Sequence, residues 1–337
     1  MGSAVHFVAG LPRSGSTLLM NLLGQNPRHH VTPTSGLIEL FVMVKNRWPE
    51  FIEFKAEGLE NVKPRVRGAL RGLLEGYFEP EFAAGKTVFD KSRGWLQYIE
   101  PLEEVLGRPV KVIVTVRDVR AIVASFEKIY RRRSIEYREP TNDAFFECQT
   151  VAGRAEVLLN PKSVVGLTIA RLSDALARGV GNRLIIVPYQ ALTTSPRETL
   201  NLLHSVLELP PFEYDPDHVE QITHEDDYFH GMPLHSVRSH VEPPREAPWK
   251  DILPPELCRR LFEQYADINR LAAWSPGGVG PNANPQSVLP TDASDESRST
   301  SAVDFIASLL ERETALPVLE GEQSAPSYDS DHCSSRG

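Results

Sequence analysis

The feature that most constrains the fold is a glycine-rich loop near the start of the chain, in the stretch VHFVAGLPRSGSTLLMNLL. The apolar, β-rich run Val5 to Ala9 predicts a strand, and the spacing of apolar residues in Ser16 to Leu23 predicts a helix. Gly10 and Gly15 have the separation found in phosphate-binding loops of the pattern GxxxxGK[ST], in which backbone N–H groups and a helix N-terminus hold phosphate oxygens. We therefore expect an α/β fold with an anion site at this loop.

The loop departs from that pattern at its cation. Ser16 stands where a nucleoside-triphosphatase has lysine, and Arg13 lies in the middle of the loop after the rigid Pro12. The missing lysine would contact β and γ phosphates, whereas an arginine at the crest presents a fork of N–H donors to the bridging oxygen of a leaving group. The loop thus predicts a donor with one 5′-phosphate rather than a triphosphate bound to magnesium.

Strands and helices alternate along the rest of the chain. The sequence predicts further strands at Thr87–Phe89, Val110–Val116 and Leu184–Val187, with helices over Val66 to Phe78, from Asp118, twice between Asn142 and Gly179, over Thr199–Leu207 and over Glu256–Trp274. Asp118 is expected to cap its helix, and Ser195 to Glu198 to form a capping box. This order predicts a P-loop-type, mostly parallel sheet flanked by helices, with the ligand beyond Ala9, Phe89, Val116 and Val187 at the strand ends.

Composition bounds the organisation and the partners. We expect one domain over residues 1–274, and a low-complexity, mostly disordered tail over 275–337 with a short amphipathic helix near 303–312. A formal net charge of -9 argues against nucleic-acid binding as the main task. Neither a membrane span nor a secretory signal is recognisable, so we expect a cytoplasmic protein. Three distant cysteines, Cys148, Cys258 and Cys333, predict neither a disulfide framework nor a metal site.

Two motifs together resemble the sulfotransferases that use 3′-phosphoadenosine 5′-phosphosulfate (PAPS), in which the loop for the 5′-phosphosulfate group reads like GLPRSGSTLL. The arginine at position 13 resembles the loop of the bacterial and protein-tyrosine branches, because the cytosolic small-molecule branch has lysine at this position. In VTVRDVRAIVASF the resemblance assigns Arg117 and Ser125 to the 3′-phosphate. It covers roughly Val5 to Trp274 and implies PAPS as the sulfate donor.

Other residues are carried over from the family one at a time. Lys91 in FDKSRGW matches a lysine near the leaving-group oxygen, and Tyr189 in VPYQAL matches a tyrosine near the adenine. Arg238 and Ser239 in HSVRSHVEP resemble the late segment that closes over the nucleotide, where a serine assists catalysis. The resemblance therefore implies catalytic roles for Arg13, Lys91 and Ser239, and nucleotide binding by Arg13, Ser14, Gly15, Ser16, Thr17, Arg117, Ser125, Tyr189, Arg238 and Ser239.

The position of the catalytic base departs from the family. The glutamate that accepts the acceptor's proton is expected a short way past the first helix, where this chain has Thr34 and Ser35. The base is left open, with Glu39, His29, His30, His224 and Asp90 as candidates. Asp90 is also interpreted as the ion-pair partner of its neighbour Lys91.

The resulting hypothesis is a sulfotransferase that moves the sulfuryl group of PAPS to a hydroxyl or amine acceptor, with Arg13 and Lys91 stabilising the leaving group and no magnesium. One alternative is a P-loop kinase-like phosphotransferase with Asp90 or Asp118 as its magnesium-binding acid. The other is a noncatalytic protein that binds 3′-phosphoadenosine nucleotides. The residues do not decide the oligomeric state, nor whether the acceptor is a peptide tyrosine, a carbohydrate or a small-molecule alcohol.

Overall fold

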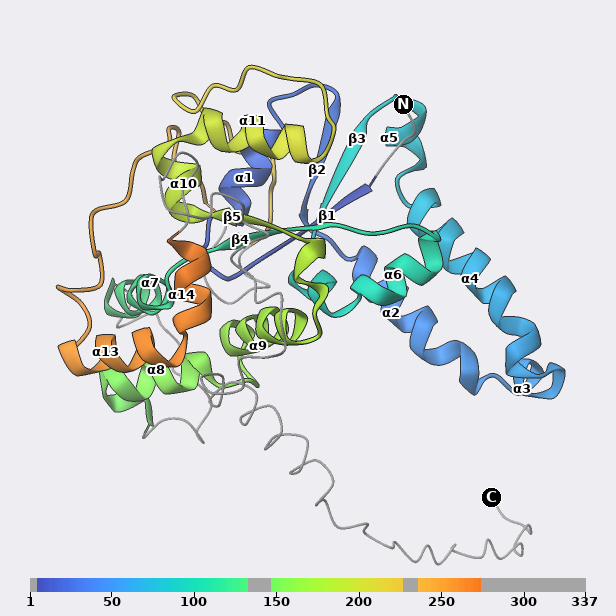
Figure 1. The fold of residues 1–337 in the computed structure, drawn as a ribbon, viewed down its shortest axis with the longest axis horizontal. Helices are drawn as coiled ribbons and strands as arrows, with labels where there is room; N and C mark the ends of the chain where they lie inside the picture. The colour runs from blue at the N-terminus through green and yellow to red at the C-terminus, as the bar shows by residue number, and fades with distance from the viewer. Residues whose placement is uncertain (1–4, 133–146, 227–235, 274–337) are drawn as a thin grey trace, which may run out of the picture. The chain divides into compact units, whose positions relative to one another are not determined.

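The structure is a computed structural model that describes residues 5–132, 147–226 and 236–273 (Figure 1). The chain divides into two units, Met1–Ser294 and Asp295–Gly337, and every described residue belongs to the first. The expected tail, its helix near 303–312 and Cys333 lie outside the described residues.

A five-stranded sheet in the order β2-β3-β1-β4-β5 forms the centre of the first unit. Its strands are β1 (Val5–Gly10), β2 (His29–Thr34), β3 (Thr87–Lys91), β4 (Val112–Val116) and β5 (Leu184–Pro188). All four pairings are parallel, and Val8 of β1 is aligned with both Lys91 of β3 and Ile113 of β4. The predicted parallel α/β class is confirmed, and the C-terminal ends of the strands meet at one edge.

Helices cover both faces of the sheet (Figure 1). One face packs against α1 (Ser16–Leu23), α10 (Tyr189–Thr194) and α11 (Pro196–Val206). The other packs against α2 (Leu37–Arg47), α4 (Leu59–Gly76), α6 (Ile99–Leu106), α7 (Val119–Arg132), α9 (Val164–Ala177) and α14 (Ala266–Ala272). The remaining elements are α3 (Ile52–Glu57), α5 (Glu79–Ala83), α8 (Val151–Leu159), α13 (Pro255–Gln264) and the 3₁₀ turns η1 (Trp48–Glu50), η2 (Arg93–Gln97), η4 (Glu147–Gln149) and η5 (Val180–Arg183).

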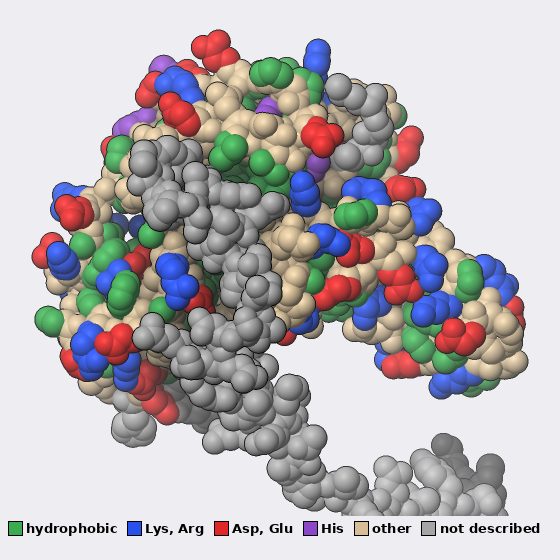
Figure 2. Space-filling view, viewed as in Figure 1, with side chains coloured by type: hydrophobic (Ala, Val, Ile, Leu, Met, Phe, Trp, Pro, Cys, Tyr) green, Lys and Arg blue, Asp and Glu red, His purple; other side chains and the backbone are tan. Residues whose placement is uncertain are grey.

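The strand residues fill two apolar cores, one on each face. Phe7 and Ala9 point into the larger core and Val8 into the smaller, as the alternation of side chains along a strand requires. All five residues of β4 are buried, which explains why its sequence reads as a continuous β-branched run. Away from these cores, positive and negative side chains alternate over α3 and α4 (Figure 2), where Arg65 pairs with Glu57.

The strand β2 does not follow from the sequence pattern. Its residues, HHVTPT, are mostly polar and include Pro33, which cannot donate a ladder hydrogen bond. An edge strand tolerates such a proline, and the pairing with β3 shifts register between Val31 and Thr34. This strand leads the chain to the same edge of the sheet as the loop after β1.

Two other expectations are wrong in detail, and one is confirmed. The single helix predicted over Glu256–Trp274 is two helices, α13 and α14, which separate at Tyr265, and Trp274 lies outside the described residues. The helix after Ser195 begins at Pro196, but the Ser195 side chain makes no capping hydrogen bond. By contrast, Asp118 Oδ1 accepts a hydrogen bond from the backbone N–H of Arg120 at 2.8 Å, as a cap of α7 should.

Candidate active site

The loop between β1 and α1 lies at the C-terminal edge of the sheet. Gly10 is so close to β4 that a Cβ there would lie 2.0 Å from Thr115 Oγ1. Gly15, the N-cap of α1, has a left-handed φ of 87°. The first N–H groups of a helix have no acceptor within the helix, and Gly15 has no side chain to cap them. This loop and helix end fit a bound anion, as the sequence predicts.

Arg13 joins the two sequence motifs. Its φ of 62° is left-handed, which is uncommon for a residue other than glycine and is found where surrounding contacts hold a strained backbone. Its Nε donates to Ser125 Oγ of α7 at 3.2 Å, and its carbonyl oxygen accepts from Nη1 of Arg117 at 2.8 Å. Residues separated by 104 and 112 positions are thereby brought to one place.

Tyr189, the first residue of α10, packs against this cluster. The Cζ atom of Arg117 lies 4.1 Å from the centre of the Tyr189 ring, in a cation–π contact. A Cβ on Gly15 would approach Tyr189 Cδ2 to 2.8 Å. Burial lowers the pKa of Arg117, yet a guanidinium keeps its charge throughout the physiological range. Four of the predicted binding residues, Arg13, Arg117, Ser125 and Tyr189, therefore form one connected group.

A cavity of about 310 Å³ adjoins Arg117 and Tyr189. Its walls include the segment 244–249, with Arg245 and Trp249, and residue Asn269 of α14. This volume is at the lower end of the range for small-molecule sites. The sequence pattern does not single out Arg245 or Trp249, because they lie in an irregular, proline-rich segment without periodicity.

Ser14, which was expected to bind the 5′-phosphate, is turned into the protein. Its side chain is fully buried, and its hydroxyl oxygen lies 2.5 Å from the carbonyl of Leu11, 2.9 Å from the carbonyl of Thr115 and 2.6 Å from Thr115 Oγ1. Its backbone N–H donates to the Leu11 carbonyl at 3.2 Å. These contacts fix the loop to β4, while Ser16 and Thr17 occupy the half-exposed first turn of α1.

Lys91 is the last residue of β3, and it forms a buried ion pair with Glu225. The two side chains are 7% and 5% exposed, and Lys91 Nζ lies 2.8 Å from Glu225 Oε1. The same oxygen accepts the backbone N–H of Thr34 at 2.8 Å. Burial lowers the pKa of Lys91, an effect that Glu225 opposes. Although burial alone raises the pKa of Glu225, Lys91 and Thr34 hold it lower, at about 2.

The expected ion pair between Asp90 and Lys91 is wrong, because Lys91 pairs with Glu225. The buried Asp90 is not the partner of Lys91, since its Oδ2 accepts a hydrogen bond from Trp95 Nε1 at 2.8 Å and burial raises its pKa to about 6. Asp118 pairs with Arg120 at 2.6 Å. Asp90 and Asp118, the two candidates for a magnesium-binding acid in the kinase alternative, thus each contact another side chain of the protein.

The other candidate bases are spread over the molecule. Glu39 lies exposed on α2, and His30 lies 3.7 Å from Glu81. His29 is buried beside Phe89, and burial lowers its pKa to about 4. His224 is exposed next to Glu225.

Arg238 and Ser239 contact residues outside the loop after β1. Both are exposed, with Arg238 paired to Glu242 and the Ser239 carbonyl accepting from the backbone N–H of Val219 at 2.7 Å. These contacts do not join them to the loop, and their proposed roles at the nucleotide stay predictions.

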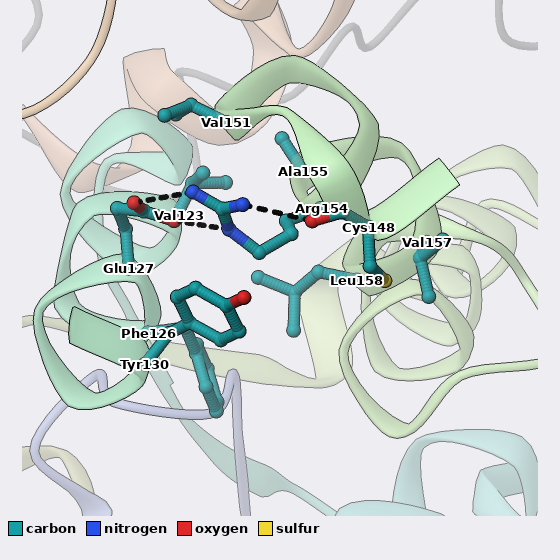
Figure 3. Close-up of a pocket in the computed structure, with 10 residues that line it drawn as sticks. All are labelled: Val123, Phe126, Glu127, Tyr130, Cys148, Val151, Arg154, Ala155, Val157 and Leu158. Atoms are coloured by element: carbon teal, nitrogen blue, oxygen red, sulfur yellow. Dashed lines mark hydrogen bonds and ion pairs between the residues drawn. The ribbon is translucent and has the colours of Figure 1, made fainter. Parts of the chain in front are cut away.

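A second cavity, of about 80 Å³, lies between α7 and α8 (Figure 3). Glu127 accepts hydrogen bonds from Arg154 at 2.8 and 2.9 Å, and the Arg154 guanidinium lies 4.2 Å from the Tyr130 ring centre. The remaining lining is mostly apolar and includes Cys148. None of the predicted donor-binding residues lines this cavity, so we assign its charged groups to the packing of α7 on α8.

The described residues contain neither a cluster of metal ligands nor a membrane-spanning helix. In the ranges 5–132, 147–226 and 236–273, no group of three or more His, Cys, Asp or Glu side chains is placed to hold a metal ion. Over the same ranges, every helix is too short or too polar to span a bilayer.

The fold is α/β, with a strand–loop–helix whose geometry suits an anion, and comparison with known proteins gives the family of the chain. Residues 6–214 match the model of the sulfotransferase family, so the chain belongs to that family. Nodulation protein NoeE of Sinorhizobium fredii (strain NBRC 101917 / NGR234) is 27% identical over 205 residues, which are 58% of this chain and 47% of that protein. The chain thus spans about half the length of this curated relative.

Solved sulfotransferase structures are also similar. The sulfotransferase domain of the Synechococcus PCC 7002 olefin synthase is 18% identical with a TM-score of 0.46, over 79% of this chain and 95% of that one. Sulfotransferase STF9 of Mycobacterium avium is 14% identical with a TM-score of 0.44, over 79% of this chain and 77% of that one.

Proposed function

We propose that this member of the sulfotransferase family uses PAPS and transfers its sulfuryl group to a hydroxyl or amine acceptor. The observation that carries the proposal is the meeting of Arg13, Ser125 and Arg117 beside the N-terminus of α1. Two cations and an uncapped helix end suit a ligand with two anionic groups. A nucleotide with phosphates at both its 3′ and 5′ positions has that charge pattern.

Each residue of the cluster has a role in holding the donor. The first turn of α1, with Gly15, Ser16 and Thr17, would hold the 5′-phosphate through N–H and hydroxyl donors. Arg117 and Ser125 would hold the 3′-phosphate. Tyr189 would lie near the adenine, beside the 310 Å³ cavity.

Sulfuryl transfer breaks the bond between sulfur and the bridging oxygen of the 5′-phosphate and forms a bond from sulfur to the acceptor atom. The acceptor loses its proton, and negative charge grows on the departing phosphate oxygen. Cations placed at that oxygen stabilise the transition state more than the ground state, which raises the rate of the chemical step. We assign this role to Arg13, in the loop that follows β1, and to Lys91, the last residue of the neighbouring strand β3.

The test is transfer of labelled sulfate from PAPS to pooled phenols, sugars and alcohols in excess EDTA. Transfer should continue in chelator, since the loop lacks the lysine that accompanies magnesium in triphosphatases. Arg13→Ala and Lys91→Ala should each lower turnover by about 10²-fold or more with nucleotide affinity changed by less than about tenfold. Lys86→Ala, at the opposite end of β3, is the matched control and should keep full activity.

The outcomes separate the alternatives. Absence of sulfate transfer from PAPS, together with magnesium-dependent transfer of phosphate from ATP, would support a phosphotransferase instead. Normal turnover by Lys91→Ala would remove Lys91 from the mechanism while leaving the PAPS assignment intact.

A further inference from the structure

The Lys91–Glu225 pair is built more firmly than a surface ion pair. Lys91 ends β3, where its backbone N–H donates to Thr32 Oγ1 of β2 at 2.9 Å and its carbonyl accepts from Ser35 at 2.8 Å. Its ammonium lies 2.8 Å from Glu225 Oε1, and both side chains are over nine-tenths buried. In such a place a lysine without a partner would lose its proton more easily than in water.

Glu225 is held in place from two sides. The amide oxygen of Asn21, on α1, accepts the backbone N–H groups of Ile222 at 2.5 Å and Thr223 at 3.0 Å, and its Nδ2 donates to Thr223 Oγ1 at 2.9 Å. On the other side, Glu225 Oε1 accepts the backbone N–H of Thr34. A segment distant in sequence is thereby fixed with its carboxylate against the end of β3.

The charges that act on Lys91 come from the irregular segment that contains Glu225 and from η2. Glu225 favours the protonated form of Lys91, and the half-buried Arg93 of η2 opposes it. Asp90, next to Lys91 on β3, is engaged with Trp95. Among the described residues, the carboxylate in contact with the Lys91 ammonium is therefore that of Glu225.

We propose that Glu225 is the positioning residue of the sulfuryl-transfer site, which keeps the Lys91 side chain in place and protonated until charge develops on the leaving oxygen. This inference rests on the proposed function, because it gives Lys91 its role at that oxygen. A neutral amine could not stabilise a departing phosphate oxygen as an ammonium does. Glu225 acts through Lys91 and not as the acceptor's base, since its Oε1 already accepts hydrogen bonds from Lys91 Nζ and from the backbone N–H of Thr34, and these contacts favour the ionised carboxylate.

The experiment compares Glu225→Gln and Glu225→Asp with the wild type. Glu225→Gln should lower kcat by about 10- to 100-fold, and the alkaline limb of its pH profile should move to lower pH because Lys91 loses its proton more easily. Glu225→Asp should recover part of the activity, and the alkaline limb of its pH profile should lie between those of Glu225→Gln and the wild type. Glu220→Gln, an exposed glutamate of the same segment, should match the wild type.

A second arm replaces the lysine. In the double variant Lys91→Arg, Glu225→Gln, the alkaline limb should disappear, because a guanidinium stays charged at every accessible pH. An alkaline limb unchanged from that of Glu225→Gln would mean that Lys91 does not titrate there, which would overturn the proposal.

A third readout needs no donor and no activity. In protein with ¹³C-labelled lysine, the Cε resonance of Lys91, assigned with Lys91→Arg, should titrate at lower pH in both Glu225 variants than in the wild type. An unchanged titration would overturn the proposal, even if the wild type failed to bind PAPS. If the pH profile of kcat for Glu225→Gln lost its acid limb and kept its alkaline limb, Glu225 would instead be the base that accepts the acceptor's proton.

Discussion

Replacing Arg117 by alanine should remove the preference of this protein for adenosine 3′,5′-bisphosphate over AMP. The two nucleotides differ by the 3′-phosphate that we assign to Arg117 and Ser125. Of the five N–H donors of Arg117, one donates to the carbonyl of Arg13, while the guanidinium face lies on Tyr189. The remaining donors are fixed in direction before any ligand arrives.

The size of the effect follows from these contacts. A hydrogen bond between charged groups contributes about 1.5 to 3 kcal/mol, which is about 10- to 150-fold in affinity. Arg117→Ala also removes the hydrogen bond to the Arg13 carbonyl, which costs about 1 kcal/mol in the loop. Because that loss weakens the binding of both nucleotides equally, it cancels in the ratio of their affinities. Ser125→Ala should lower the ratio less, since a hydroxyl is neutral.

Isothermal titration calorimetry with both nucleotides measures the ratio directly. Arg183→Ala is the matched control, because Arg183 precedes β5 at the opposite edge of the sheet and pairs with Glu103 at 2.6 Å. Equal affinity of the wild type for the two nucleotides would refute PAPS as the donor. A preference that survives Arg117→Ala would keep the donor but move its 3′-phosphate to another cation, such as Arg245 in the cavity wall or Arg238.

Two further predictions concern the loop and the core. Gly15→Ala should abolish nucleotide binding in the same calorimetric assay, because its Cβ would meet Tyr189 at 2.8 Å, whereas Gly85→Ala, with φ of 71° and no atom within 4 Å, should destabilise the fold slightly and bind normally. Normal binding by Gly15→Ala would contradict the close packing of Tyr189 on the loop. His6 is stacked on Phe89, and burial lowers its pKa to about 4, so only the unfolded chain gains a proton as the pH falls from about 6.5 to about 4. His6 should therefore contribute a fall of about 3 kcal/mol in the free energy of unfolding over that window, in addition to the contribution of His29, whose pKa is lowered in the same way. His6→Phe should remove the His6 part of the fall in urea unfolding curves measured at several pH values, and an equally steep fall in the variant would contradict this account.

The parts of the site that sequence predicts are those with a local signal. Gly10, Arg13 and Gly15 lie between a buried strand and an amphipathic helix, so their pattern, order and spacing are enough to indicate an anion loop. Arg117 follows a run of β-branched residues that is typical of a strand covered on both faces. Since parallel strands end at one edge, the meeting of these residues follows from topology.

The left-handed φ of Arg13 and the edge strand β2 have no such signal. Glycine is the usual residue at positive φ, so an arginine there is recognised only from coordinates. The strand β2 contains a proline and lacks alternation, because an edge strand is under weaker constraints than a central one.

Glu225 shows why the remaining part of the site stays hidden in the sequence. It lies in an irregular segment, and that segment is held by backbone N–H groups, which every residue except proline possesses. The one local clue is Asn21, a fully buried amide in the apolar stretch LLMNLL. A buried amide must find hydrogen-bond partners, so Asn21 implies that a polar segment crosses α1, although it does not say which. The structure identifies that segment as 222–225. The segment forms hydrogen bonds with Asn21, and the same path of the chain places the Glu225 carboxylate against Lys91.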